Sequence, residues 1–234
     1  MSAPRYAFAP PPVPAAAIAG TDELFPVRRI FCVGRNYAAH AREMGKDPDR
    51  EPPFFFTKPA DALVSGDATI AYPSLTSNLH FEGELVVAIG KGGANIARDA
   101  ALDHVFGYAC GNDLTRRDLQ NVAKDMARPW DWAKAFDRSA PCGPIVRASE
   151  VGQFDSGAIR TLVNGVEKQS ADLADMIWPV ADVIAFLSQA MEIAPGDLIF
   201  TGTPAGVGRL EPGDICVIEI DRLPPLKTTI APRG

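Results

Sequence analysis

Two glutamates at the start of an apolar run carry the clearest chemical signal in this sequence. Glu82 and Glu84 lie two residues apart, where the apolar run 84–89 begins. Because side chains alternate along an extended strand, this spacing places both carboxylates on one face. Adjacent carboxylates raise each other's pKa unless a cation neutralises them. The pair indicates either a site for a hard cation such as Mg²⁺, Mn²⁺ or Ca²⁺, or a polar strand face that points to water.

Asp113 is the third candidate ligand. It follows a second apolar run, 103–110, and the small residues Gly111 and Asn112. An aspartate at a strand end is a common metal ligand, but it also caps helices and turns. His80 shares the register of the glutamates and is a weaker candidate. The chain has three histidines, so a zinc centre rich in histidine is hard to build.

Two further positions carry groups that can move protons or bind anions. His40 and Glu43 lie three residues apart on a predicted helix, 37–44, and therefore share a face. A carboxylate beside an imidazole raises its basicity, as a general base requires, although an ordinary exposed helical pair has the same spacing. Lys134 follows the aromatic segment 128–133 and is either a buried cation that receives an anion or a surface lysine beside a packed tryptophan.

Strands outnumber helices in the pattern along the chain. Pro179 precedes a helical repeat over 180–191, and Thr115 is predicted to cap a helix over 116–124. The pair 164–165 (Asn-Gly) predicts a hairpin turn. The predicted strands are 28–33, 54–57, 84–89, 103–110, 198–201 and 215–220. Since helices do not alternate regularly with strands, the pattern favours an α+β fold with a large mixed or antiparallel sheet.

Length and composition favour one large domain. The chain has 234 residues, 47% of them hydrophobic, which is typical of a globular protein. Prolines at positions 10, 11, 12 and 14 predict an extended N-terminal arm over residues 1–25, which neither helix nor sheet pairing would include. Residues 26–234 are predicted to form a single catalytic domain.

Net charge and targeting signals limit the classes of partner and the cellular location that we expect. A net charge of −6 argues against a nucleic-acid surface. The sequence has neither a secretion signal nor an apolar stretch of about 20 residues, so we expect a cytoplasmic protein without a membrane partner. The four cysteines form no CxxC pair, and Cys32, Cys110 and Cys216 are predicted to be buried thiols because they lie in apolar runs. The glycine-rich segment 202–208 lacks nucleotide-binding spacing and suits a backbone cradle for a carboxylate.

Six segments, in this order, resemble the fumarylacetoacetate hydrolase family, and together they extend over nearly all of the chain after the arm. They are CVGRNYAAHAREM (32–44), FFFTKP (54–59), HFEGELVVAIG (80–90), GNDLTRRDLQ (111–120), WAKAFD (132–137) and PGDLIFTGTPAGVG (195–208). One departure is Gly83, where bulkier residues are common in the family. We expect this glycine to loosen the strand locally without changing the spacing of the ligands.

The resemblance implies a β-rich mixed sheet roll of the fumarylacetoacetate hydrolase C-terminal-domain type, with few short helices and a homodimeric active form. It also implies roles for the candidate residues. The implied metal ligands, for Mg²⁺ or Mn²⁺, are Glu82, Glu84 and Asp113; the implied catalytic residues are His40, Glu43 and Lys134; the implied substrate contacts are Arg117, Gln120 and Thr203. Arg35 and Lys58 lie in matching motifs without an implied role.

Within this family, the chain length and the segment 128–137 are closest to the members that hydrolyse acylpyruvates. The expected substrate is a small 2-oxo acid, and the expected reaction is hydrolysis of fumarylpyruvate to fumarate and pyruvate. Decarboxylation of oxaloacetate and hydratase or isomerase chemistry on a 2-oxo acid are the enzymatic alternatives. A non-catalytic protein with a structural ion is a third. The pair of His40 and Glu43 favours hydrolysis, because it supplies activated water. Segment 45–53 is a candidate lid.

Overall fold

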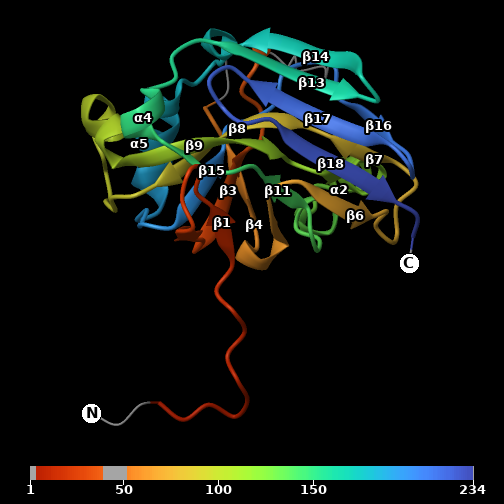
Figure 1. The fold of residues 1–234 in the computed structure, drawn as a ribbon, viewed down its shortest axis with the longest axis horizontal. Helices are drawn as coiled ribbons and strands as arrows, with labels where there is room; N and C mark the ends of the chain where they lie inside the picture. Colours follow the sequence, from red (N-terminus) through yellow and green to blue (C-terminus); the bar gives the residue numbers. More distant parts are fainter. Residues whose placement is uncertain (1–3, 39–51, 234) are drawn as a thin grey trace.

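A mixed β-sheet forms the centre of the fold in the computed structural model, which describes residues 4–38 and 52–233. Its strands are β3 (Arg29–Val33), β4 (Phe55–Lys58), β5 (Leu63–Ser65), β8 (Gly83–Ile89), β9 (Val105–Asn112), β11 (Ala140–Cys142), β12 (Val146–Arg147) and β15 (Asp197–Phe200). They follow the order β4-β3-β15-β8-β9-β11-β5, with β12 paired to β9 (Figure 1). The pairs β3–β15 and β5–β11 are parallel, whereas the other pairs are antiparallel.

A five-stranded sheet covers one face of this central sheet. Its strands are β6 (Ala68–Ala71), β13 (Ala158–Val163), β14 (Val166–Asp172), β17 (Ile215–Ile220) and β18 (Leu226–Ala231). The order is β14-β13-β17-β18-β6. The main core includes Leu85 and Val87 of β8 and Ile218 and Ile230 of the five-stranded sheet, all fully buried. Asn164 and Gly165 both have positive φ, as a two-residue hairpin turn requires, so the predicted turn is confirmed.

Alternation along β8 divides its side chains between two apolar clusters. Leu85 and Val87 belong to the main core, whereas Val86 and Ala88 belong to a second cluster with Phe200. Because the period of a strand is two residues, the even-numbered positions of this segment face away from the main core. This alternation determines the face on which Glu82 and Glu84 lie.

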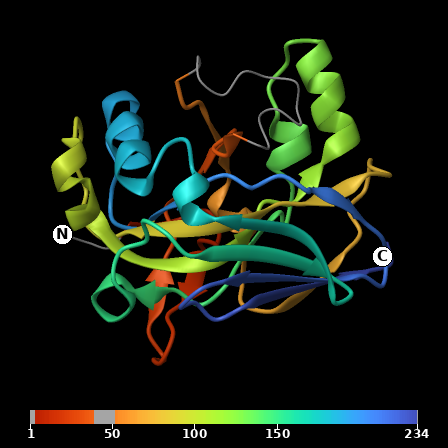
Figure 2. The same ribbon diagram turned by 90° about the horizontal axis from the view of Figure 1, so that it is seen from above.

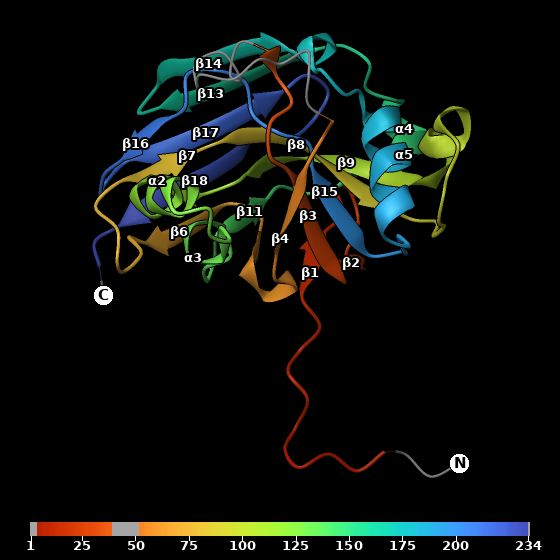
Figure 3. The same ribbon diagram turned by 180° about the vertical axis from the view of Figure 1, so that it is seen from behind.

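Short elements flank the two sheets. A three-stranded sheet contains β7 (Leu79–Phe81), β10 (Thr115–Arg116) and β16 (Gly208–Leu210). Helices α2 (Arg117–Asp125) and α3 (Asp131–Lys134) lie at one end of the molecule, and α4 (Ala148–Val151) and α5 (Val180–Ala190) lie at the other (Figure 3). Figure 2 shows the helices α2 and α5 standing on the same side of the sheets. Short 3-10 helices cover Ala60–Ala62, Arg98–His104 and Leu173–Asp175.

The N-terminal segment differs from its prediction. Strands β1 (Ala15–Ala17) and β2 (Leu24–Pro26) pair antiparallel, and Ala16 and Phe25 are buried in the second cluster. The expectation that prolines keep all of 1–25 out of sheet pairing is therefore wrong from residue 15 onward, because the prolines end at Pro14. Residues 4–14 contain no helix or strand and extend away from the body (Figure 1).

The predicted fold class is confirmed as a β-rich mixed sheet with few short helices. The strand predicted at 103–110 begins only at Val105 and continues to Asn112. Thr115 does not cap a helix: it lies in β10, its hydroxyl donates to the Asp113 carbonyl at 2.9 Å, and α2 begins at Arg117. The helix predicted at 37–44 lies, from residue 39 on, outside the described residues.

Two smaller expectations concern thiols and membranes. All four cysteines are free and buried. Among the described residues, no helix is long and apolar enough to span a bilayer.

Candidate metal centre

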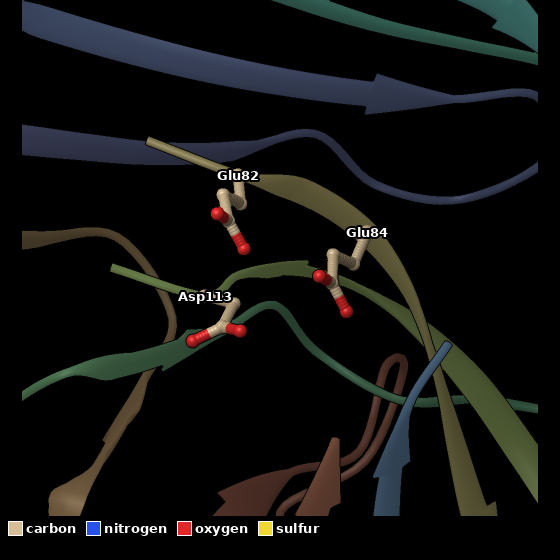
Figure 4. A group of neighbouring side chains, drawn as sticks. All are labelled: Glu82, Glu84 and Asp113. Carbon is tan, nitrogen blue, oxygen red and sulfur yellow. The ribbon is translucent and has the colours of Figure 1, made fainter. Parts of the chain in front are cut away.

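Three buried carboxylates meet where β8 begins and β9 ends. One ligand oxygen each from Glu82, Glu84 and Asp113 lies within 4.8 Å of the others, and none of the three residues is more than 5% exposed. Figure 4 shows the carboxylates facing a common space. The antiparallel register pairs Glu84 with Gly111, and the Asp113 amide donates to the Glu82 carbonyl at 2.9 Å. Strand pairing therefore brings Asp113 beside Glu84 and Glu82, from which it is separated by 29 and 31 residues in sequence.

Three cationic side chains contact this carboxylate cluster. The Lys134 ammonium lies 2.7 Å from Glu82 Oε2 and 2.6 Å from Asp113 Oδ2. The Lys58 ammonium lies 2.8 Å from Asp113 Oδ1, and Arg117 donates to Glu82 Oε1. All three cations are buried. Three carboxylates and three cations balance formally, which is how so many charges are tolerated away from water.

Glu84 differs from the other two carboxylates because it forms no ion pair within the described ranges. Its Oε2 accepts a hydrogen bond from the Gly202 amide at 2.8 Å. Burial, together with the charges of Asp113 and Glu82, raises the pKa of Glu84 well above its usual value. A bound divalent cation would supply the positive counter-charge that the Glu84 carboxylate lacks. Carboxylate oxygens are also the donors that Mg²⁺ and Mn²⁺ prefer. The residues present therefore fit such an ion.

We expect the affinity of the protein for Mn²⁺ to increase as the pH rises above about 4.5, the ordinary pKa of glutamate, toward the raised pKa of Glu84. In that range the ion must displace the proton of Glu84, so binding releases protons. Because the pKa of Glu84 is higher in the folded state than in the unfolded state, this group stabilises the metal-free folded protein at pH values below 4.5. That contribution to the free energy of unfolding decreases as the pH rises from 4.5 toward the raised pKa. Calorimetric titration in two buffers of different ionisation enthalpy measures the protons released. An affinity independent of pH would contradict this assignment.

Lys134 is the central cation of the cluster. Burial by itself lowers the pKa of its ammonium, but the Asp113 and Glu82 carboxylates outweigh burial and hold the pKa above its usual value. The residue is 2% exposed, and these two carboxylates keep its ammonium charged despite that burial. Two of its three N–H groups donate to the carboxylates. The lysine is thus a buried cation, and not a surface residue beside a tryptophan.

Gly83 faces the five-stranded sheet, opposite to its two glutamate neighbours. A Cβ at this position would lie 2.2 Å from Thr161 Oγ1 and 3.2 Å from Gln169 Oε1. The glycine allows β13 and β14 to approach β8 closely, which is a role that its neighbours in the sequence did not predict. It is buried, and its amide donates to Gln169 Oε1 at 3.1 Å.

Replacing Gly83 by alanine should destabilise the protein by about 1–3 kcal/mol, the usual cost of overpacking a core. The added methyl forces Thr161 away, because these atoms would otherwise overlap. Thr161 Oγ1 is buried and has no hydrogen-bond partner among the residues that the structure describes, so Thr161→Ala removes the obstacle at little cost. Urea denaturation of both single variants and the double variant checks this, since the double variant should recover most of the loss. Equal destabilisation of Gly83→Ala with and without Thr161→Ala would refute the contact.

Thr203 is held by residues on both sides. Its hydroxyl donates to the Gly83 carbonyl at 2.9 Å and accepts from Gln169 Nε2 at 2.8 Å. Gln169 also donates to the Pro204 carbonyl at 2.7 Å. Because the hydroxyl proton is already committed to Gly83, a contact of Thr203 with a substrate carboxylate stays a prediction. Gln169 is 1% exposed and positions this turn, a role that its sequence context does not reveal.

Arg117 and Gln120 lie together on α2 beside the carboxylates. Arg117 Nη1 donates to Gln120 Oε1 at 2.6 Å, while its Nη2 holds Glu82. Both residues line a cavity of about 520 Å³ that Glu82 and Lys134 also line. The amide nitrogen of Gln120 is thereby oriented by Arg117. The structure thus places both predicted substrate contacts at the cavity beside the metal centre.

Of the two histidines with a predicted role, His80 lies in the described part of the chain and His40 does not. His80 does not join the carboxylate group: its Nε2 contacts Asn78 Oδ1 at 3.0 Å, and its Nδ1 lies 3.4 Å from Arg117 Nε. Burial, followed by the charge of Arg117, lowers the pKa of His80 to about 4. His40, Glu43 and most of the candidate lid 45–53 lie outside the described residues.

Two residues without a predicted role help to build the site. Lys58 holds Asp113 and also donates to the Leu114 carbonyl at 3.2 Å and to the Lys134 carbonyl. Asn36 is fully buried and donates to the carbonyls of Trp178 at 2.9 Å and Thr201 at 2.8 Å. Both lie in motifs that carry the family resemblance, and this position was the one sign in the sequence that they belong to the site. The bonds they form join segments that are distant in sequence.

Comparison with known proteins defines the class of this chain. The sequence model of the family described as fumarylacetoacetate (FAA) hydrolase C-terminal matches residues 29–231 of this chain. The chain therefore belongs to the fumarylacetoacetate hydrolase family. Fumarylpyruvate hydrolase from a Ralstonia species is 44% identical over 191 residues, which are 81% of this chain and 99% of the relative.

Solved structures agree with this assignment. The crystal structure of fumarylpyruvate hydrolase from Pseudomonas aeruginosa, in complex with Mn²⁺ and pyruvate, has a TM-score of 0.97 and 52% identity and covers 98% of this chain and 100% of its own. Other activities also occur among the relatives. The mitochondrial oxaloacetate decarboxylase of Dictyostelium discoideum is 39% identical over 189 residues, 80% of this chain and 86% of the relative.

Proposed function

We propose that this chain is a metal-dependent hydrolase that cleaves a carbon–carbon bond of an acylpyruvate, with fumarylpyruvate as substrate and fumarate and pyruvate as products. The observation that carries the proposal is the buried cluster of Glu82, Glu84 and Asp113 beside a cavity lined by cations. A carboxylate cluster of this kind suits a hard cation, and the cationic cavity suits an anionic 2-oxo acid. Similarity to a fumarylpyruvate hydrolase that binds Mn²⁺ and pyruvate supports the same substrate class.

In this proposal Glu82, Glu84 and Asp113 hold Mg²⁺ or Mn²⁺. When bound, the ion supplies Lewis acidity and orients the 2-oxo acid. Arg117 and Gln120 bind the 2-oxo acid end of the substrate, since both line the cavity next to Glu82. The remaining N–H of the Lys134 ammonium donates to an oxygen of the substrate that gains negative charge.

The reaction itself adds water across one carbon–carbon bond. The oxygen of water bonds to the acyl carbonyl carbon, and the bond from that carbon to the adjacent methylene breaks. Its electron pair passes to the pyruvate portion, which then takes up a proton. We assign removal of the water proton to His40, oriented by Glu43. His40→Ala should abolish hydrolysis while Mn²⁺ still binds, and hydrolysis at the parent rate would remove His40 from this role.

The experiment that tests the proposed function is a steady-state assay of a small panel of acylpyruvates with Mn²⁺ or Mg²⁺ in the buffer. We expect loss of the diketone absorbance with fumarylpyruvate, together with equimolar fumarate and pyruvate, and no turnover after chelation of the metal. Absence of turnover with every acylpyruvate in the presence of either ion would contradict the proposal.

Decarboxylation of oxaloacetate is the second candidate, because a relative with that activity covers 80% of this chain. Both reactions generate charge on a pyruvate portion, but only hydrolysis needs an attacking water. Release of CO₂ from oxaloacetate, compared with cleavage of fumarylpyruvate at the same enzyme concentration, separates the two. If decarboxylation were the faster reaction, the carbon–carbon hydrolase assignment would be replaced.

A homodimer remains a prediction of the family resemblance, and a cytoplasmic location remains a prediction from the targeting signals of the sequence. Sedimentation equilibrium should give twice the chain mass of 25.0 kDa. A mass of one chain in the presence of Mn²⁺ would exclude the dimer.

A further inference from the structure

One face of α2 lines the cavity beyond the metal centre. Arg117, Gln120, Asn121 and Lys124 all contribute to its wall. Their spacing of three, four and seven residues from Arg117 places them on one side of a helix. Arg117 holds Glu82 at the metal end, so Lys124 lies one to two turns farther from the carboxylates. Arg128, which follows α2, lines the same cavity.

The charge of this cavity is strongly unbalanced at the end away from the metal centre. Among the described lining residues, Glu82 is the one carboxylate, and it is already bound by Arg117 and Lys134. Lys124 and Arg128 form no ion pair with a carboxylate within residues 4–38 and 52–233. The Lys124 ammonium instead lies 5.3 Å from the centre of the Trp130 ring. Two cations thus share a cavity wall without an anionic partner in the described parts of the chain.

The electrostatics of Lys124 agree with this arrangement. Lys124 is exposed to solvent, and partial desolvation in the cavity wall, followed by the positive charge of Arg117, lowers its pKa to about 8. Lys134 and Arg35 lower the pKa further, whereas Glu82 raises it without cancelling the shift. A bound anion would offset these neighbouring charges and restore the charged form of the lysine.

The length of the cavity wall suits a substrate with an anion at each end. Arg117 and Lys124 are seven residues apart on α2, a rise of about 10 Å. Helical side chains lean toward the N-terminus of the helix, which brings the ammonium closer to the metal end. The two carboxylates of fumarylpyruvate are separated by six bonds, or about 7 Å when extended. A 2-oxo acid end at the metal centre therefore places the second carboxylate near Lys124 and Arg128.

We propose that Lys124 and Arg128 form the subsite that binds the second carboxylate of a dicarboxylate substrate, the fumaryl carboxylate in the case of fumarylpyruvate. This assignment rests on the proposed function, because it takes the 2-oxo acid end to lie at the metal centre. It makes these residues determinants of specificity: they select acylpyruvates that end in a carboxylate over those that end in a methyl group.

The test compares fumarylpyruvate with acetylpyruvate, an acylpyruvate that ends in a methyl group, using Lys124→Met, Arg128→Met and the double variant. We expect the ratio of kcat/KM for fumarylpyruvate over acetylpyruvate to decrease about tenfold in each single variant, mainly through KM, which is typical for loss of a charge-assisted hydrogen bond. The double variant should lose more than either. Lys168→Met, an exposed lysine on β14 that does not line the cavity, is the matched control and should keep the parent ratio.

A binding measurement separates this proposal from the proposed function. Calorimetry on the Mn²⁺-loaded protein should show weaker binding of fumarate to Lys124→Met and Arg128→Met, with pyruvate binding much less affected. If the parent cleaves neither acylpyruvate, the hydrolase assignment fails, and the fumarate titration still decides the subsite. Fumarate affinity and substrate ratio within twofold of the parent in the double variant would overturn the subsite.

Discussion

Glu84→Gln should lose Mn²⁺ binding by at least about 100-fold and carbon–carbon hydrolysis by three orders of magnitude or more, while the metal-free protein becomes no less stable. The amide is isosteric and can still accept from the Gly202 amide, but it offers no negative charge to an ion. In the absence of metal, burial and then the charges of Asp113 and Glu82 disfavour the Glu84 carboxylate, which is why its pKa is raised. Removal of that charge relieves the repulsion.

This combination distinguishes a metal ligand from a structural residue. Thermal unfolding with EDTA should give a Tm equal to or above that of the parent. With Mn²⁺ at 100 times the parent Kd, the parent should gain about 2.7 kcal/mol and the variant should gain little. Glu167→Gln, which changes an exposed carboxylate on β14, is the control and should retain the gain. A variant that loses stability in EDTA but binds Mn²⁺ like the parent would show that Glu84 is structural.

Lys134→Met should lower the stability of the metal-free protein by about 3–5 kcal/mol, because it leaves two buried carboxylates without their shared cation. Methionine keeps the length and apolar character of the lysine stem, so the change isolates the charge. The ammonium contacts Glu82 and Asp113 at 2.7 and 2.6 Å, and Lys58 and Arg117 then remain as the cations that contact them. Hydrolysis should fall by about 10²–10³, the usual effect of losing a donor to developing charge.

The stabilisation that Mn²⁺ gives to Lys134→Met, compared with the parent, tests the role of this lysine more directly. A divalent ion compensates the same carboxylates, so it should stabilise Lys134→Met by more than it stabilises the parent. Chemical denaturation with and without Mn²⁺ measures both gains, and Lys168→Met on the exposed side of β14 serves as the control. A smaller metal-induced gain in Lys134→Met than in the parent would mean that Lys134 does not balance the metal ligands.

These two variants test one electrostatic property from opposite sides. The metal-free cluster is formally neutral, with Glu82, Glu84 and Asp113 facing three cations, yet one carboxylate lacks an ion pair among the described residues. A bound divalent ion makes the cluster positive, and an anionic 2-oxo acid is then the natural counter-charge. The expected order is therefore metal first and substrate second.

Local patterns were sufficient for several features of this protein. The alternation through 82–89 placed Glu82 and Glu84 on one strand face, and the apolar repeat after Pro179 predicted α5. The Asn164–Gly165 pair predicted the hairpin of β13 and β14. These features depend on side-chain periodicity and turn conformation, which act over a few residues and can be read from the sequence.

Other features depend on contacts between distant segments. Only the pairing of β8 with β9 placed Asp113 beside Glu82, and only the approach of β13 explained why no larger side chain fits at Gly83. Lys58 and Gln169 likewise acquire their roles from partners more than 30 residues away. Long-range strand pairing and burial decide these contacts, and neither leaves a periodic trace in the local sequence. The amino-acid sequence alone therefore identified the candidate ligand carboxylates and the strands that carry them, whereas the tertiary structure decided how the charges around these carboxylates are balanced.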